Sequence, residues 1–264
     1  MNCRKLIACD IDGTLLSYGE TTLSGEIFDL IRELQRAGIC FCTASGRQYH
    51  SLRKLFEPVA DEIAYLCENG AVVLGRGSEE NSLLFSSVEI PKKDALAIAQ
   101  DVLSFPNCEV LLSARNCYYV CSTSEDFLKY LEVDNGALVK KVDDLEKVSE
   151  KIFKVSMINR RGEIQVPQKV LSEKWKDYYV TISGEVWVDI ALADKGSGLR
   201  AMCSALGFTL DDCIAFGDNW NDVSMLEVAG TGYLMESADK ELLERFPNHC
   251  RSVPEILKTL LKKL

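Results

Sequence analysis

The sequence predicts an α/β protein, a Rossmann-like doubly wound parallel-sheet core with a smaller α+β domain inserted into it. The first third of the chain alternates short apolar runs with stretches of helical periodicity, and this pattern returns from residue 192. In between, the apolar runs are arranged as hairpins and isolated strands. The 264 residues suffice for two modest cores. We therefore expect residues 1–82 and 192–264 to form the core and residues 83–191 to form an inserted cap domain.

The first segment is expected to begin with a buried strand over residues 6–9. A helix follows, because apolar residues recur at helical spacing behind a candidate N-cap at Ser24 and stop before Gly38. The next expected elements are a strand over 39–43, a helix over 48–56 and a strand over 63–67. Strands that alternate with helices are typical of a parallel sheet with right-handed crossovers.

The middle of the chain changes character where Gly, Ser, Glu and Asn cluster over residues 78–82, which predicts a linker. A helix over 92–103 is expected next, followed by a hairpin of 109–113 with 118–122 and by strands over 153–158, 178–183 and 186–190. The alternating pattern then predicts a helix over 195–206, a strand over 213–216, a helix near 222–229 and two further helices before the C-terminus.

The composition excludes several classes of partner. A formal charge of −10 and a pI near 4.9 disfavour nucleic acid, whose binding depends largely on Lys and Arg. No run approaches the roughly 18 consecutive apolar residues of a membrane span, and no signal-peptide core precedes the first strand. We therefore expect a cytoplasmic protein without a membrane partner. The sequence does not specify an oligomeric state.

Histidine and cysteine carry little of the expected chemistry. Only two histidines are present, which excludes a histidine-rich zinc site. The 11 cysteines contain no CxxC pair, and several lie within apolar runs, so we expect reduced thiols in the core. Any reaction must therefore rely on carboxylates, hydroxyls and lysine.

Polar residues follow three of the predicted core strands. Ligands of an open parallel sheet bind beyond the carboxyl ends of its strands, so these residues are expected to meet in one crevice. The set consists of Asp10 and Asp12 after the first strand, Ser45, Gly46 and Arg47 after the second, Asp218, Asn221 and Asp222 after the strand ending at Phe216, and Lys195 at the start of a helix.

Several carboxylates in one crevice repel one another unless a cation neutralises them, and an oxygen-only set suits Mg²⁺. A carboxylate can also attack phosphorus to form an aspartyl phosphate, and Asp10 has the position for that attack. Asp12 can then exchange protons with the leaving group and with water, and Gly13 permits the tight backbone that this requires. The Ser45 hydroxyl, the Gly46 amide and the Lys195 charge can bind phosphate oxygens.

Four motifs carry a family resemblance: DIDGT at residues 10–14, SGR at 45–47, KGSGL at 195–199 and GDNWND at 217–222. In order and spacing they resemble the motifs of the haloacid dehalogenase superfamily of phosphatases. The insertion after SGR and the CENGAVV segment at 67–73 are similar to the Cof-type subfamily, which carries a large α/β cap of type IIB. The resemblance implies a haloacid dehalogenase-like core fold and Mg²⁺ as the cofactor.

The resemblance also implies individual roles. Asp10 matches the nucleophile, Asp12 the general acid/base, which reaches the metal through its backbone carbonyl, and Lys195 the motif lysine. Ser45 matches the phosphate-holding hydroxyl, Asp218 a metal carboxylate, Asn221 a phosphate-contacting amide and Asp222 a metal ligand or a carboxylate just behind it. Serine replaces the commoner threonine at position 45, and MESAD at 235–239 lacks a glycine-asparagine pair often found there.

Some residues allow two interpretations. Arg47 suits a substrate contact or a structural salt bridge, and His50 is better explained as a helix residue than as a catalyst. Arg115, Asn116 and Tyr118 lie near a predicted hairpin tip that can overhang the crevice, but loop solubility explains them equally well.

The leading hypothesis is a Mg²⁺-dependent phosphatase acting on a small phosphorylated metabolite, with a sugar phosphate as the first candidate by analogy. A phosphomutase that returns the phosphoryl group to its substrate is one alternative. An aspartate-phosphorylated signalling receiver is another, although Asp12 and the inserted domain argue against it.

Overall fold

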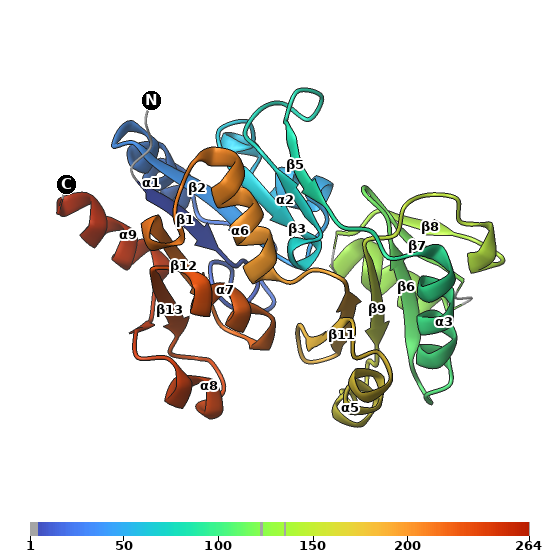
Figure 1. Cartoon of the computed structure of the whole chain (residues 1–264). Coiled ribbons are helices and arrows are strands. Elements are labelled where there is room, and N and C mark those ends of the chain that lie inside the picture. Colours follow the sequence, from blue (N-terminus) through green and yellow to red (C-terminus); the bar gives the residue numbers. More distant parts are fainter. Residues whose placement is uncertain (1–4, 122–123, 135, 264) are drawn as a thin grey trace.

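The computed structural model describes residues 5–121, 124–134 and 136–263, which fold into two lobes, each built on its own sheet (Figure 1). The larger sheet has eight strands in the order β14-β13-β12-β1-β2-β3-β4-β5. Its strands are β1 (Lys5–Cys9), β2 (Ile39–Ala44), β3 (Ala64–Cys67), β4 (Val72–Leu74), β5 (Leu84–Ser87), β12 (Cys213–Gly217), β13 (Thr231–Met235) and β14 (His249–Cys250).

Strand β1 lies in the middle of this sheet and pairs in parallel with β2 on one side and β12 on the other. The chain runs from β1 to β2 and reaches β12 only much later, so the strand order reverses at β1. Such a reversal opens a crevice beyond the carboxyl ends of the two strands. The fold therefore places the residues that follow β1 and β12 at the mouth of one crevice.

Alternate residues of the central strands contribute to two separate apolar clusters, as expected for a sheet covered on both faces. Ile7 and Cys9 pack with helices α1, α2 and α9, whereas Leu6 and Ala8 pack with α6, α7 and α8. These helices are α1 (Gly25–Arg36), α2 (Tyr49–Leu55), α6 (Lys195–Leu206), α7 (Val223–Val228), α8 (Lys240–Arg245) and α9 (Val253–Lys262). The predicted doubly wound core is confirmed.

The predicted start of the cap at residue 83 is wrong. Strand β5 pairs antiparallel with β4 at the edge of the larger sheet, and Phe85 packs against a core cluster. The polar residues 78–82 form the loop of this β4–β5 hairpin and not a linker between lobes. The chain leaves the core sheet only after Ser87.

The smaller sheet has six strands in the order β10-β11-β9-β6-β7-β8, antiparallel except for β7 with β8. Helices α3 and α5 cover one face, while α4 and the π-helical turn that follows it pack on the other. The elements are β6 (Glu109–Ser113), β7 (Tyr118–Val120), β8 (Val139–Lys141), β9 (Lys154–Ile158), β10 (Tyr179–Ile182), β11 (Trp187–Ala191), α3 (Lys92–Leu103), α4 (Glu125–Lys129) and α5 (Gln165–Lys174). The predicted helix, hairpin and three later strands of this domain are confirmed, although β7 ends at Val120 and residue 122 of the predicted hairpin lies outside the described residues. The elements α4, α5 and β8 were not predicted.

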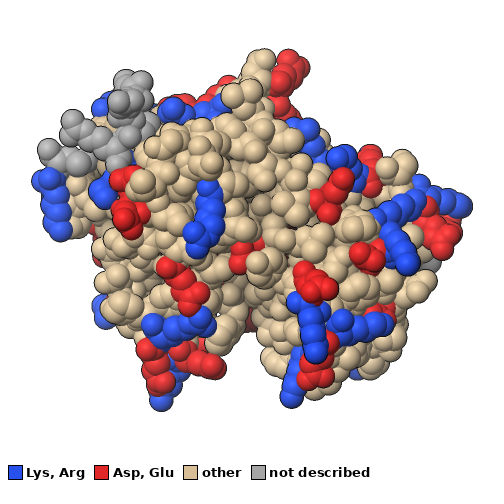
Figure 2. All heavy atoms as spheres, viewed as in Figure 1, with Lys and Arg blue, Asp and Glu red and all other residues tan. Residues whose placement is uncertain are grey.

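Other expectations from composition can be compared with the described residues. None of the helices in them is long and apolar enough to cross a membrane. The cysteines among them are free thiols and mostly buried, although Cys121 is exposed, and Cys3 lies outside the described residues. On the face shown in Figure 2, Lys and Arg side chains are interspersed with Asp and Glu rather than gathered in one patch.

Gly70 lies in the tight turn after β3 and packs closely against the start of α6. Its φ is +96°, and a Cβ at this position would lie 2.1 Å from the carbonyl oxygen of Asp194. We expect Gly70→Ala to lower the free energy of unfolding by roughly 2–5 kcal/mol, because strain and overpacking add together. Chemical denaturation measures this change.

Gly207 provides the matched control, since its φ is +76° but nothing lies within 4 Å of the position that an added methyl group would take. Gly207→Ala should cost only the conformational penalty of about 1–2 kcal/mol. Equal losses in the two variants would contradict the close approach between the turn and α6.

Candidate active site

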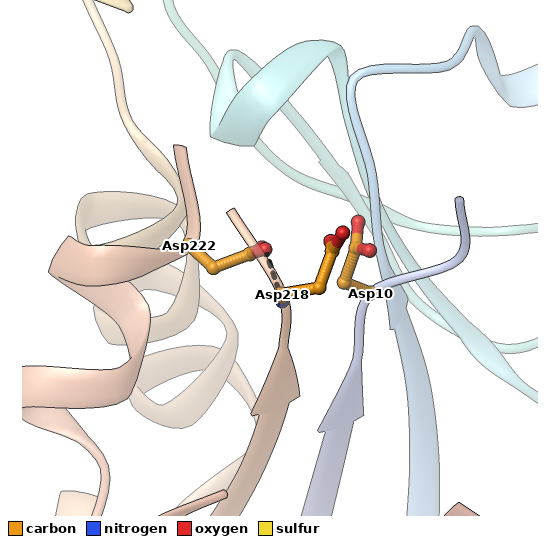
Figure 3. Close-up of side chains that lie close together, drawn as sticks. All are labelled: Asp10, Asp218 and Asp222. Carbon is orange, nitrogen blue, oxygen red and sulfur yellow. Dashed lines mark hydrogen bonds between the residues drawn. The ribbon is translucent and has the colours of Figure 1, made fainter. Parts of the chain in front are cut away.

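Three aspartates meet at the carboxyl ends of β1 and β12. Asp10 follows β1, Asp218 follows β12, and Asp222 ends the short 3₁₀ turn before α7. Each is buried, and one oxygen from each carboxylate lies within 4.8 Å of the others. Figure 3 shows the Asp10 and Asp218 side chains side by side, with Asp222 reaching toward them from the neighbouring turn. The structure thus brings together three of the predicted carboxylates.

Lys195 neutralises part of this charge. Its Nζ lies 2.6 Å from Asp10 Oδ1 and 2.6 Å from Asp222 Oδ1, and the side chain is fully buried. Burial lowers the pKa of Lys195, but the adjacent carboxylates outweigh it and raise the pKa above its ordinary value. Asp194 caps α6 and places Lys195 in the first turn of that helix. The lysine therefore remains cationic beside Asp10.

Asp222 organises its surroundings. While Oδ1 binds Lys195, Oδ2 accepts the backbone N–H groups of Asp218 at 3.0 Å and Asn219 at 3.1 Å. Both carboxylate oxygens already have partners, so this residue holds the lysine and the Asp218 loop in place. Asp222 also offers an oxygen to the cluster with Asp10 and Asp218, so both of the roles considered for it remain compatible with the geometry.

Asp218 is held by two hydroxyl groups. Tyr18 donates to Oδ2 at 2.8 Å and Thr14 donates to Oδ1 at 3.4 Å. Burial, followed by the nearby charge of Asp222, raises the pKa of Asp218 to about 6. Gly13 passes close to this carboxylate, because a Cβ there would lie 2.1 Å from Asp218 Oδ2 at a φ of +88°. The expected need for glycine at position 13 is explained by this approach.

The surroundings of the Asp10 carboxylate indicate whether the site suits a metal ion. Its Oδ2 is buried and has no hydrogen-bond partner among the described residues. Burial, then the charge of Asp222, raises the pKa of Asp10 well above its ordinary value. Burying an unpaired carboxylate oxygen is costly unless a further group binds it. A hard cation between Asp10 and Asp218 suits this oxygen-only donor set.

Asp12 lies apart from the three clustered carboxylates. Its two oxygens accept hydrogen bonds from Arg47, at 2.7 Å from Nε and 2.6 Å from Nη2. Asp12 and Arg47 both line the cavity between the lobes, and the Asp12 side chain is 41% exposed. The structure therefore shows Arg47 in a salt bridge, and the same residue faces the space open to a substrate. In this structure both oxygens of the Asp12 carboxylate are bound by Arg47, and the carboxylate does not join the cluster of Asp10, Asp218 and Asp222.

Three of the four predicted phosphate-binding residues line the same cavity, whereas Lys195 is fully buried and lies outside its lining. Ser45, Gly46 and Asn221 face it together with Asp10 and Asp218. Ser45 Oγ accepts the backbone N–H of Arg47 at 3.1 Å, which orients the hydroxyl. This cavity has a volume of about 520 Å³, within the range of small-molecule sites.

Sequence reasoning missed a buried ion-pair network where the cap meets the core. Lys154 of β9 lies 3.2 Å from Glu68 and 3.2 Å from Asp189 of β11, and its Nζ donates to the carbonyl of Gly46 at 2.7 Å. Burial lowers the pKa of Lys154, but Asp189 and then Glu68 raise it more strongly. The available signal was a charged residue inside each of two apolar strands, at Lys154 and Asp189.

The side-chain amide of Asn69 connects this network to Asn221, one of the predicted phosphate-binding residues. Asn69 Nδ2 donates to Asp189 Oδ2 at 2.7 Å, and Asn69 Oδ1 accepts from Asn221 at 3.2 Å. Asn69 has a φ of +53° and follows Glu68, whose φ is +51°. The left-handed turn of the CENGAVV segment thus orients the Asn69 side chain so that it contacts both Asp189 of the cap and Asn221 of the core.

The structure separates the residues for which the sequence allowed two interpretations. Tyr118 is buried and lines the cavity, whereas Arg115 and Asn116 are exposed and outside its lining. His50 lies on α2 and is also outside the lining. Of these, only Tyr118 is positioned to contact a substrate.

Comparison with known proteins gives one family. The family model described as haloacid dehalogenase-like hydrolase matches residues 7–255. A 5-amino-6-(5-phospho-D-ribitylamino)uracil phosphatase of Escherichia coli is 30% identical over 237 residues, which cover 89% of this chain and 86% of that protein. A pyridoxal phosphate phosphatase of the same species is 26% identical, covering 91% of each chain.

The fold is also similar to solved structures. A Streptococcus mutans protein superimposes with a TM-score of 0.84 at 25% sequence identity, covering 98% of this chain and 99% of that one. The superposition covers nearly the whole chain, so the similarity extends over both lobes. The resemblance drawn from the four motifs is confirmed.

Lys154 offers a test of the cap–core network. Lys154→Met leaves Glu68 and Asp189 buried without their cation, and we expect it to lower the free energy of unfolding by about 3–5 kcal/mol. The nearby Lys151→Met removes an exposed ion pair with Glu89 and should cost less than about 1 kcal/mol. Denaturant titration of the two variants distinguishes them, and similar losses would show that the buried network contributes little.

Proposed function

Because the chain belongs to the haloacid dehalogenase-like hydrolase family, we propose that it hydrolyses its substrate with Mg²⁺ and through an aspartyl phosphate on Asp10. The protein is a phosphatase of small phosphorylated metabolites, as its relatives are. The observation that supports the proposal most directly is the buried Oδ2 of Asp10, which has no hydrogen-bond partner in the described part of the chain, while the other oxygen is bound by Lys195.

The metal would be held by the Asp10 and Asp218 carboxylates and, as the family resemblance implies, by the backbone carbonyl of Asp12. When bound, Mg²⁺ supplies positive charge that offsets the charge of the transferring phosphoryl group. Asp222 supports this site indirectly, since its oxygens bind Lys195 and the backbone of the Asp218 loop.

In the first displacement, an Asp10 carboxylate oxygen bonds to phosphorus while the bond from phosphorus to the ester oxygen breaks. Asp12 donates a proton to the departing oxygen, so the product is a neutral alcohol. In the second displacement, water attacks phosphorus, Asp12 accepts its proton, and the bond between Asp10 and phosphorus breaks to release inorganic phosphate. Ser45, Asn221 and the Gly46 amide hold the phosphate oxygens throughout, and Lys195 stabilises their charge.

For the substrate we propose a phosphorylated sugar or sugar derivative. The relatives act on a phosphorylated ribityl compound and on pyridoxal phosphate, according to their names. Polar side chains in the lining of the cavity, including Thr21, Gln48 and Ser51, suit a hydroxylated leaving group. Product analysis also separates hydrolysis from a mutase, which yields a positional isomer and no inorganic phosphate.

Phosphate release is the test of this function. We expect the wild-type protein to release inorganic phosphate from at least one ester in a panel of sugar, nucleotide and cofactor phosphates, only when Mg²⁺ is present. Asp10→Asn keeps the shape of the side chain but removes the nucleophile, so it should release none while its circular dichroism spectrum is unchanged. Release without Mg²⁺, or by Asp10→Asn, would contradict the proposed mechanism.

Asp12→Asn should separate the two displacements. With p-nitrophenyl phosphate, whose leaving group needs no proton, we expect a rapid burst of about one nitrophenol per enzyme and then turnover slowed by roughly 10²–10⁴-fold, because the base for water is missing. Stopped-flow absorbance measures both phases. Asp10→Asn is the control and should show no burst, and near-normal steady-state turnover by Asp12→Asn would refute its role.

Asp218→Asn should weaken metal binding, because a magnesium site tolerates the loss of a charged ligand poorly. We expect the Mg²⁺ concentration for half-maximal activity to rise by more than about tenfold. Tyr18→Phe removes only a hydrogen bond to the same carboxylate and should produce a smaller rise. An unchanged Mg²⁺ requirement in Asp218→Asn would place the metal elsewhere.

A further inference from the structure

Two cysteines of the core are in direct contact at a place remote from the active site. The Sγ atoms of Cys203 and Cys213 lie 3.2 Å apart, although their positions in the chain differ by 10. Cys203 is in the last turn of α6, and Cys213 is the first residue of β12. Both side chains are buried in the apolar cluster that covers one face of the larger sheet. The fold thus brings two free thiols together.

The pair lies at the ends of α6 and β12 that point away from the catalytic residues. Lys195 is the first residue of α6 and precedes Cys203 by about 12 Å along the helix axis. Asp218 follows the last residue of β12, about 16 Å along the strand direction from Cys213. Chemistry at the two thiols therefore does not involve the side chains that bind the phosphate or the metal.

The segment that connects the two cysteines lies on the surface of the protein. None of residues 204–212 is buried. The segment ends α6 at Gly207, which has a left-handed conformation, and continues through the 3₁₀ turn Leu210–Asp212. Helix ends and surface turns open locally at a lower free-energy cost than the strands of a core sheet. A small oxidant or reductant can therefore reach the two thiols when this segment opens.

The contact between the two thiols makes them chemically unequal. The hydrogen bond from Cys213 lowers the pKa of Cys203, because it stabilises the thiolate, although burial opposes this effect. The same contact, followed by burial, raises the pKa of Cys213. The thiolate is the nucleophilic form of cysteine. Cys203 is therefore the thiol that reacts first.

A disulfide between these cysteines requires only a small rearrangement. The S–S bond is about 2.05 Å long, so the two Sγ atoms have to approach by about 1.2 Å. Other buried thiols have different partners. Cys250 donates to the thioether of Met235 at 3.6 Å, and Cys42 donates to the carbonyl of Thr43 at 3.0 Å. Neither of these two contacts can become a disulfide.

We propose that Cys203 and Cys213 are a redox pair, which hydrogen peroxide converts to a disulfide in the folded protein and which a thiol reductant restores. The Cys203 thiolate attacks one peroxide oxygen, so an S–O bond forms, the O–O bond breaks and hydroxide leaves. The Cys213 sulfur then attacks the Cys203 sulfur, so the S–S bond forms and a second hydroxide leaves. The two thiol protons convert both hydroxides to water, and two electrons pass from the thiols to the peroxide.

The disulfide joins the end of α6 to the start of β12 and closes a short surface loop. Such a crosslink restricts the unfolded chain, and it also limits the local opening of the loop that it closes. Oxidation therefore holds together more firmly the two elements that carry Lys195 and Asp218. This modification goes beyond the proposed phosphatase function and does not depend on it.

Mass spectrometry tests the pair in the wild-type protein. Trypsin releases residues 201–240 as one peptide, because no Lys or Arg lies between Arg200 and Lys240, and this peptide contains no further cysteine. After folded protein is treated with hydrogen peroxide and its remaining thiols are alkylated, we expect the peptide to be unalkylated and lighter by two hydrogen atoms. Cleavage beside Asp211 should then give two fragments that separate only when dithiothreitol is added.

The exposed Cys121 shows whether the oxidant has acted. A fully alkylated 201–240 peptide from protein in which Cys121 has been oxidised would overturn the inference. Linkage of Cys203 or Cys213 to Cys42 instead of to each other would also overturn it.

Two substitutions provide matched variants. Cys203→Ala removes one member of the pair, so Cys213 should be alkylated after the same treatment. Cys250→Ala removes a buried thiol whose contact is with Met235, and it should leave the crosslink unchanged. Loss of the crosslink in Cys250→Ala, or loss of two hydrogen atoms in Cys203→Ala, would contradict the assignment. The measurement on the wild-type protein needs no substitution, so it tests the pair even where Cys203→Ala disturbs folding.

Hydrogen exchange distinguishes oxidation of the folded protein from oxidation after unfolding. We expect the amides of residues 204–212 to exchange at least about tenfold more slowly in the oxidised protein, while those of β1 exchange at an unchanged rate. Faster exchange in β1 would mean that the disulfide forms only by disrupting the core sheet, and it would overturn the inference. Neither the crosslink nor the exchange rates require that any ester is hydrolysed.

Discussion

The contact on which the rest of the site depends is the pair of 2.6 Å ion pairs that Lys195 makes with Asp10 and Asp222. Three buried carboxylates cannot stay close and ionised without a compensating cation. Lys195 provides part of that charge from the first turn of α6, so this helix must approach the ends of β1 and β12. Glycines also bring α6 close to the turn after β3, since a Cβ on Gly198 would lie 2.7 Å from the Cα of Gly70.

The cap uses one sheet face for two purposes. At one end, Lys154 and Asp189 join the cap to the Gly46 loop and, through Asn69, to Asn221. At the other end the same face becomes aromatic around Trp187. The cavity is therefore lined by residues of both lobes, with aspartates of the core on one side and the cap sheet facing them.

The sequence was sufficient to place the residues that follow the core strands, because the sheet topology determines where these residues lie. Residues directly after parallel strands must lie at the same edge, so Asp10, Ser45 and Asp218 were brought together by the strand pattern alone. Charged residues inside two apolar strands marked Lys154 and Asp189, but their pairing was not predictable, because the partners of Lys154 lie 35 to 108 residues away and no local pattern pairs them. Strand β5 was assigned to the wrong domain because it is short and only half-buried, and it is recognisable only through its pairing with β4.

The central claim is that the phosphoryl group passes through Asp10, and mass spectrometry of acid-quenched protein tests it most directly. Protein mixed with Mg²⁺ and a hydrolysed ester, quenched during turnover and digested, should yield a phosphorylated peptide that contains Asp10. Borohydride reduction of the acyl phosphate should convert residue 10 to homoserine. Turnover that leaves this peptide unmodified, or phosphorylation of another residue, would contradict the account.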